Sequence, residues 1–225
     1  MEEKFEKIRE IIKEKTWASD HNIDHINRVY SFAMRIGEGE NIDWDVLKAA
    51  VLLHDIAGAE EQNDPTGKTD HAVLGAQISR PILENLGFPE EKIRHIQDCI
   101  LSHRYRTNNT PKTLEAKILF DADKLDATGA IGVARAFSWI GRNNAHIFKK
   151  VDDINEYIKE NLEGGVANGR IKDKTKHSPQ INFETKEKFL VNQLYTQKAK
   201  EICAERVTYY KNFLDRLEKE IKSEI

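Results

Sequence analysis

The sequence is short of the features that mark several large classes of protein. It has 2 cysteines in 225 residues, which are too few for a disulfide framework and fit a reducing compartment. No apolar run reaches the roughly 18 residues that a membrane helix needs, and the N-terminus lacks the pattern of a secretory signal. The net charge is −3, so no overall positive field favours nucleic acid or an anionic membrane. We therefore expect a soluble, cytoplasmic protein without a membrane or nucleic-acid partner.

Glycine and proline are also scarce, at 12 and 5 residues, and no stretch alternates convincingly between polar and apolar residues. Glu, Lys, Leu, Ile and Ala are abundant instead, and all but Ile are strong helix formers. Apolar residues recur at helical spacing in most of the chain. The expected helices cover about 2–15, 22–36, a segment from a cap at Asp43 to a stop at Gly58, 71–86, 89–102, 113–125, 128–140, 152–162 and 183–222. These patterns predict an all-α protein and a single domain over 1–225, with a less ordered segment at about 141–182.

One stretch of this pattern places ionisable side chains where apolar side chains are expected. The apolar run over 51–53 leads directly into His54 and Asp55 at the end of an expected helix. An uncompensated charge in such a place is costly, so the pair needs a partner. Imidazole nitrogen and carboxylate oxygen are both good ligands for a divalent metal, but two residues cannot hold an ion alone.

The rest of the chain supplies further candidates. His25, His54, Asp55 and Asp123 come from three expected helices, inside them or near their ends. A helical protein builds a metal site when such side chains converge inside a bundle. His71 and His103 stand at two more helix ends.

The order of these residues and their flanks resemble the HD-domain metal-dependent phosphohydrolases, whose pattern is a His, then His-Asp, then a late Asp. His25 lies in DHINRV (24–29), the doublet in LHD (53–55), and Asp123 in DADKLD (121–126), where it precedes Lys-Leu-Asp as the late Asp does. Relatives with two metals add two histidines, which His71 and His103 match.

The resemblance is strongest over 17–136 and extends further. The stretches 129–136 and 196–206 are similar to small stand-alone bacterial and archaeal HD hydrolases. One departure is Asn22, where many relatives carry an acid after the position of His21.

The resemblance implies an HD-domain-like helical bundle whose ligands converge on one metal site. It would hold one or two divalent ions, from Mn, Fe, Co, Ni, Zn or Mg. With two ions, Asp55 would bridge them, and the other ligands would divide into His25, His54 and Asp123 for one ion and His71 and His103 for the other. With one ion, His71 and His103 would act on phosphate or in proton transfer.

Cations are also needed around a transferring phosphoryl group. Lys124, next to Asp123, and Arg104, next to His103, are the best-placed candidates, and Arg135 is a weaker third. A basic run over 170–176 follows Gly164, Gly165 and Gly169, and we hypothesise that this segment closes over a phosphorylated substrate.

The function implied is a metal-dependent phosphohydrolase in which a metal-activated water attacks phosphorus. Its substrate would be a nucleotide or another small phosphorylated metabolite. Two alternatives stay open, a di-iron HD-type oxygenase and a non-catalytic nucleotide-binding sensor. A homodimer is also left open, and His95 and His177 are expected at the surface.

Overall fold

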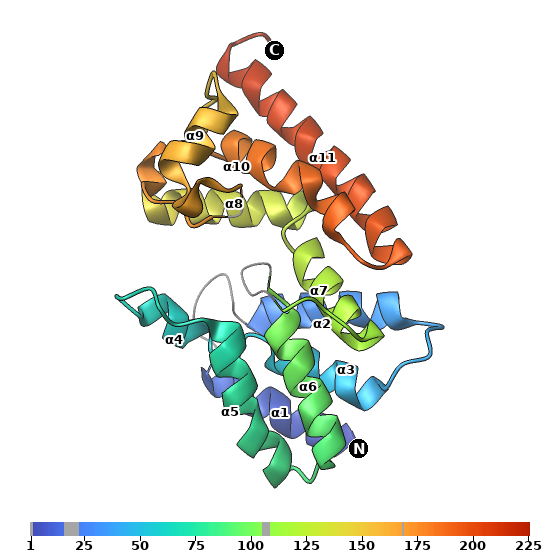
Figure 1. Ribbon diagram of the computed structural model, residues 1–225. Coiled ribbons are helices and arrows are strands. Elements are labelled where there is room, and N and C mark those ends of the chain that lie inside the picture. Colours follow the sequence, from blue (N-terminus) through green and yellow to red (C-terminus); the bar gives the residue numbers. More distant parts are fainter. Residues whose placement is uncertain (1, 16–22, 105–108, 168) are drawn as a thin grey trace. The chain divides into compact units, whose positions relative to one another are not determined.

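The computed structural model describes residues 2–15, 23–104, 109–167 and 169–225, and these are helical with short connections (Figure 1). Within these ranges the only strand-like feature is an isolated antiparallel bridge between Leu162 and Ile171. The all-α prediction is therefore confirmed. The chain forms two compact units, Met1–Asp123 and Lys124–Ile225, so the single domain expected over 1–225 stays a prediction.

The first unit packs around α3. Its helices are α1 (Glu2–Lys15), α2 (Ile23–Gly37), α3 (Trp44–Leu53), α4 (Gly58–Asn63), α5 (His71–Asn85), α6 (Glu90–Ser102) and most of α7 (Leu114–Leu125). Helix α3 contacts α1, α2 and α6, and α5 contacts α4 and α6.

The composition of α3 explains its central place. Asp43 caps the helix as expected, because its side chain accepts hydrogen bonds from the amides of Asp45 and Val46. From Val46 to Leu53 nearly every side chain is apolar and buried, and a helix that is apolar on all sides belongs in a core. The end of α3 is thereby held rigidly inside the first unit, and His54 and Asp55 follow directly.

The second unit packs around α8 and α11. Its elements are α8 (Gly129–Asn143), α9 (Ile154–Asn161), α10 (Pro179–Thr185) and α11 (Gln197–Ile221), with 3-10 turns η1 (Glu163–Gly165), η2 (Lys174–Lys176) and η3 (Glu187–Gln193). Val133 of α8 meets Phe183, Tyr210 and Leu214 in one apolar cluster. A second cluster joins Tyr157, Leu162 and Ile181.

Two glycines shape the turn that starts α8. Gly129 has a φ of 65°, in the left-handed region that side chains with a Cβ rarely adopt. Gly132 has no room for a Cβ, because that atom would lie 2.3 Å from the carbonyl oxygen of Ala127. Backbone conformation and lack of space thus favour glycine at these two positions.

Two helix boundaries differ from the prediction. The helix capped by Asp43 ends at Leu53 rather than at Gly58, and Gly58 begins α4. The long helix expected over about 183–222 is wrong at its start, because the backbone of Lys186 leaves the helical region and Thr196 caps a new helix, α11. Apolar spacing continues through Leu190 and Leu194, so periodicity alone could not detect the break.

His177 and His95 are also less exposed than predicted. His177 is buried and contacts the Tyr157 hydroxyl at 2.8 Å and the Asn182 side-chain oxygen at 3.1 Å. His95 is half-buried and its Nε2 lies 2.9 Å from the hydroxyl of Thr113. Both rings have polar partners from segments distant in sequence, which a local reading cannot supply.

Asn161 of α9 is one of the residues that hold the segment over 141–182 together. The side chain of Asn161 accepts from the amide of Asp173 and donates to its carbonyl, at 3.0 Å each. The closure of residues 164–176 over a substrate stays a prediction.

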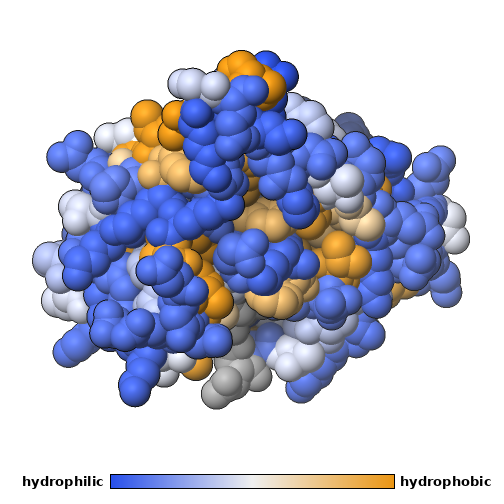
Figure 2. Space-filling view, turned by 90° about the horizontal axis from the view of Figure 1, so that it is seen from above, coloured by the Kyte–Doolittle hydropathy of each residue, from blue (hydrophilic) through white to orange (hydrophobic). Residues whose placement is uncertain are grey.

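Among the residues that the structure describes, large apolar side chains at the surface are few. They are Val73, Ile147, Val166, Phe189, Tyr195, Tyr209, Ile221 and Ile225. The face in Figure 2 is mostly hydrophilic, with small separate apolar areas. No helix among the described residues has both the length and the apolar character needed to cross a membrane.

Candidate metal centre

Helix ends of the first unit deliver all six predicted ligands. His25 lies in the first turn of α2, His54 and Asp55 follow α3, and Asp123 lies in the last turn of α7. His71 is the first residue of α5, and His103 follows the last residue of α6. Except for Asp123, all of these side chains are buried.

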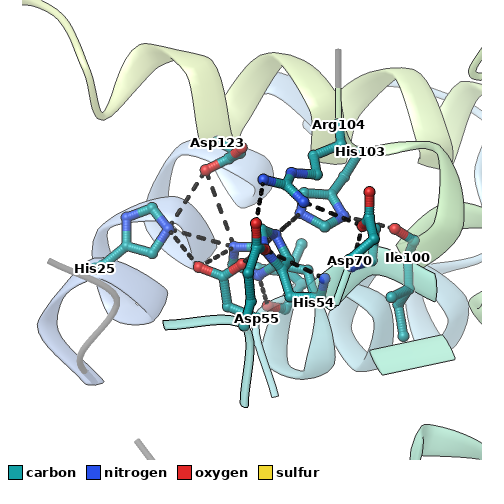
Figure 3. Close-up of polar contacts among 12 residues, drawn as sticks. His25, His54, Asp55, Asp70, Ile100, His103, Arg104 and Asp123 are labelled. Carbon is teal, nitrogen blue, oxygen red and sulfur yellow. Dashed lines mark hydrogen bonds and ion pairs between the residues drawn. The ribbon is translucent and has the colours of Figure 1, made fainter. Parts of the chain in front are cut away.

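Asp55 lies at the centre of this group and presents its two oxygens to different histidine pairs (Figure 3). Oδ2 is 3.4 Å from Nε2 of His25 and 3.5 Å from Nε2 of His54. Oδ1 is 3.1 Å from Nε2 of His71 and 3.7 Å from Nε2 of His103. Two sets of three residues have the geometry of a metal site: His25, His54 and Asp55 form one, and Asp55, His71 and His103 form the other. In each set one ligand atom per residue lies within 4.8 Å of the other two. Asp55 is the residue that the two sets share.

Asp123 joins the first set. Its Oδ1 lies 3.3 Å from Nε2 of His25 and 4.0 Å from Nε2 of His54. Asp123 thus faces the histidines at contact distance, and its choice over Asp121 stays a prediction.

The outer nitrogens of three histidines have hydrogen-bond acceptors of their own. Nδ1 of His54 lies 2.7 Å from the carbonyl oxygen of Val51, and Nδ1 of His103 lies 2.5 Å from that of Ile100. Carbonyls in the last turn of a helix lack their usual donor four residues on and can accept from a side chain, and that of Ile100 also accepts from the main-chain amide of His103 at 3.4 Å. Nδ1 of His71 donates instead to Glu61. In all three rings a proton on Nδ1 leaves Nε2 with its lone pair directed inward.

These inward lone pairs lie close together. Nε2 of His54 is 3.3 Å from Nε2 of His25, and Nε2 of His71 is 3.1 Å from Nε2 of His103. Two nitrogen lone pairs at this separation repel unless a proton or a cation lies between them. The donor set of imidazole and carboxylate therefore fits a divalent metal ion, and thiolate ligands are absent from it.

The electrostatics keep two of these rings neutral. Burial lowers the pKa of His54 to about 4, and burial likewise lowers the pKa of His103. His71 differs: burial opposes its charge, but the carboxylates of Asp55 and Glu61 outweigh burial and raise its pKa to about 9. A neutral ring is the form that binds a metal, so His54 and His103 need no deprotonation at neutral pH.

A further layer of charge surrounds His71. Glu61 of α4 accepts from its ring and forms an ion pair with Arg104 at 2.9 Å. The same guanidinium lies 3.1 Å from Asp70, whose side chain caps α5 by accepting from Ala72. Figure 3 shows the Arg104 guanidinium extending towards Asp70.

Buried histidines and aspartates that converge from the ends of several helices define a protein with a helical His/Asp metal centre. A family model for the HD domain matches residues 22–128, which contain all six of these side chains. The chain belongs to the HD-domain family.

Similar proteins extend over nearly the whole chain. YpgQ of Bacillus subtilis, which is uncharacterized, is 26% identical over 208 residues that cover 91% of this chain and 86% of YpgQ. An uncharacterized protein of Clostridium beijerinckii is 30% identical over 124 residues, which cover 54% of this chain and 70% of the relative. A crystal structure of a predicted HD superfamily hydrolase from an uncultured Thermotogales bacterium has a TM-score of 0.62 and 25% identity, covering 98% of this chain and 92% of that one.

The structure brings together the six predicted ligands, whereas two of the three predicted cations, Arg104 and Arg135, are paired with carboxylates. Arg104 lies beside the centre but contacts Glu61 and Asp70. Lys124 follows Asp123 in α7 and begins the second unit, and its contact with phosphate stays a prediction.

Sequence reasoning missed Glu61. It lies ten residues before His71 across a loop, and a loop of this length imposes no fixed spacing that a motif could record. The acidic pair at the start of a short helix was the only local signal.

Proposed function

We propose that this protein is a metal-dependent phosphohydrolase that acts on a nucleotide or another small phosphorylated metabolite. The observation that carries the proposal is the arrangement around Asp55, whose two oxygens face two separate pairs of histidines. Further support comes from YpgQ, which has been crystallised in complex with ADP and has a TM-score of 0.70 and 24% identity to this chain.

In this proposal one set of residues holds each ion. His25, His54 and Asp123 would hold the first, His71 and His103 would hold the second, and Asp55 would serve both. When bound, divalent ions lower the pKa of water and polarise a phosphoryl oxygen.

The protein's own part is to position the ligands and to supply charge. The carbonyls of Val51 and Ile100 orient the rings of His54 and His103 from main-chain positions. Of the three predicted cations, this proposal gives phosphate binding to Lys124, because it directly follows the ligand Asp123 in α7. Arg104 contacts two carboxylates and Arg135 pairs with Asp126.

The test is hydrolysis by protein stripped of metal and reloaded with Mn, Co, Ni or Mg. A panel of nucleoside mono-, di- and triphosphates and sugar phosphates would be analysed for phosphate and pyrophosphate release. Loss of a residue that only hydrogen-bonds to a metal ligand lowers activity by roughly 10- to 100-fold. Asp55→Asn should lower the activity by more than this, because it weakens both ion sites. Helix content by circular dichroism should be unchanged.

The matched control is Asp98→Asn, at an exposed position of α6, which should keep full activity. Full activity without metal, or full activity of Asp55→Asn, would contradict the proposal. Oxygen uptake without phosphate release would favour the di-iron alternative, and nucleotide binding without turnover would favour the sensor.

A further inference from the structure

Glu61 holds His71 through two atoms of that residue. Its Oε2 accepts from the ring Nδ1 of His71, and the same oxygen lies 3.3 Å from the main-chain amide of His71. That amide is the first of α5, where a carboxylate is favoured by the free amides and the helix dipole. Glu61 therefore orients both the ring and the helix end that carries it.

Glu61 is itself held from the opposite side. Its Oε1 accepts from the guanidinium of Arg104 at 2.9 Å, and only 13% of the Glu61 side chain is exposed. Arg104 also pairs with Asp70, the cap of α5. The three side chains thus link α4, the start of α5 and the end of α6.

This support is unlike that of the neighbouring ligands. His54 and His103 donate from Nδ1 to main-chain carbonyls, which no substitution removes. His71 depends on a side chain, so its orientation can be altered by changing one residue. His71 belongs to the set with Asp55 and His103 and is not part of the set with His25 and His54.

We infer that Glu61 is a positioning residue, held by Arg104, that directs Nε2 of His71 towards Asp55 and so controls the affinity of one of two ions. This inference rests on the proposed metal-dependent function. It also assigns to Arg104 a structural task in place of phosphate binding. Substitution of a residue that hydrogen-bonds to a metal ligand commonly lowers metal affinity by roughly 10- to 100-fold.

The test is a titration of the metal-free protein with Mn²⁺, in which electron paramagnetic resonance of unbound Mn²⁺ gives the affinity for each ion. Glu61→Ala should weaken the second ion by roughly 10- to 100-fold and leave the first within about 3-fold. Glu61→Gln should lie closer to the unsubstituted protein, since an amide oxygen still accepts from Nδ1. Asp123→Asn should show the opposite pattern and weaken the first ion.

Glu60→Gln is the matched control, because Glu60 is the exposed neighbour of Glu61 in α4. It should bind both ions as the unsubstituted protein does. Equal affinities in all Glu61 variants, equal weakening of both ions, or uptake of a single ion by the unsubstituted protein would overturn the inference.

The outcome separates this inference from the proposed function. A protein that binds no metal refutes the proposed function. A protein that binds two ions and hydrolyses its substrate, but is indifferent to Glu61, refutes only the role of Glu61.

Discussion

A buried carboxylate in the second unit should make stability depend on pH. Glu187, in η3, has 3% of its surface exposed. Its Oε1 accepts from the side chain of Asn182, whereas its Oε2 and the nearby hydroxyl of Tyr210 are buried and have no hydrogen-bond partner among the described residues. Burial raises the pKa of Glu187 from 4.5 to about 7, against the opposing effect of Lys186.

The sign of the effect follows from these two pKa values. The folded protein keeps the proton of Glu187 at pH values where the unfolded chain has lost it, so the free energy of unfolding falls as pH rises from about 4.5 to 7. A gap of about 2.5 pH units corresponds to roughly 3 kcal/mol, at about 1.36 kcal/mol per unit. Above pH 7 the loss is complete, and below pH 4.5 it is absent.

The substitution Glu187→Gln should remove this dependence. The amide oxygen still accepts from Asn182, and the side chain carries no charge at any pH. Between pH 5 and pH 8 the stability of Glu187→Gln should rise relative to the unsubstituted protein by about 2.5 kcal/mol.

The assay is urea unfolding followed by circular dichroism at both pH values. Amide exchange of peptides from 179–221 would assign the change to the second unit. Glu184→Gln is the control, because Glu184 is exposed in the adjoining helix α10. If Glu187→Gln and the unsubstituted protein kept the same pH dependence within about 0.5 kcal/mol, the argument from burial would be refuted.

Two further outcomes are expected. Gly132→Ala should destabilise the second unit by about 1–3 kcal/mol, because its Cβ would meet the carbonyl of Ala127. Gly141→Ala in the same helix should stabilise the unit by about 0.5–1 kcal/mol, since nothing lies within 4 Å of that Cβ. Urea midpoints of the two variants measure this difference, and equal shifts of the midpoint would contradict the steric explanation. Mn²⁺ at 100 times its dissociation constant should raise the free energy of unfolding of the first unit by about 2.7 kcal/mol. The Asp55→Asn variant should lose most of this gain. A thermal unfolding midpoint that is the same with and without Mn²⁺ would contradict the candidate centre.

Most helices could be predicted because their signals are local. The cap at Asp43 and the apolar run that follows it predicted the start of α3 and its burial. Periodicity failed at Lys186 and Thr196, where a backbone break and a new cap interrupt an apolar pattern that continues without change.

The sequence alone was also enough to select the six candidate ligands, because their residue types, order and flanks are properties of the chain. Tertiary structure decided what no spacing records. It directed the two oxygens of Asp55 to different histidine pairs, placed Glu61 against His71, and buried His177 and Glu187. These contacts join segments separated by turns and loops, and their distances depend on how whole helices pack rather than on the residues between them.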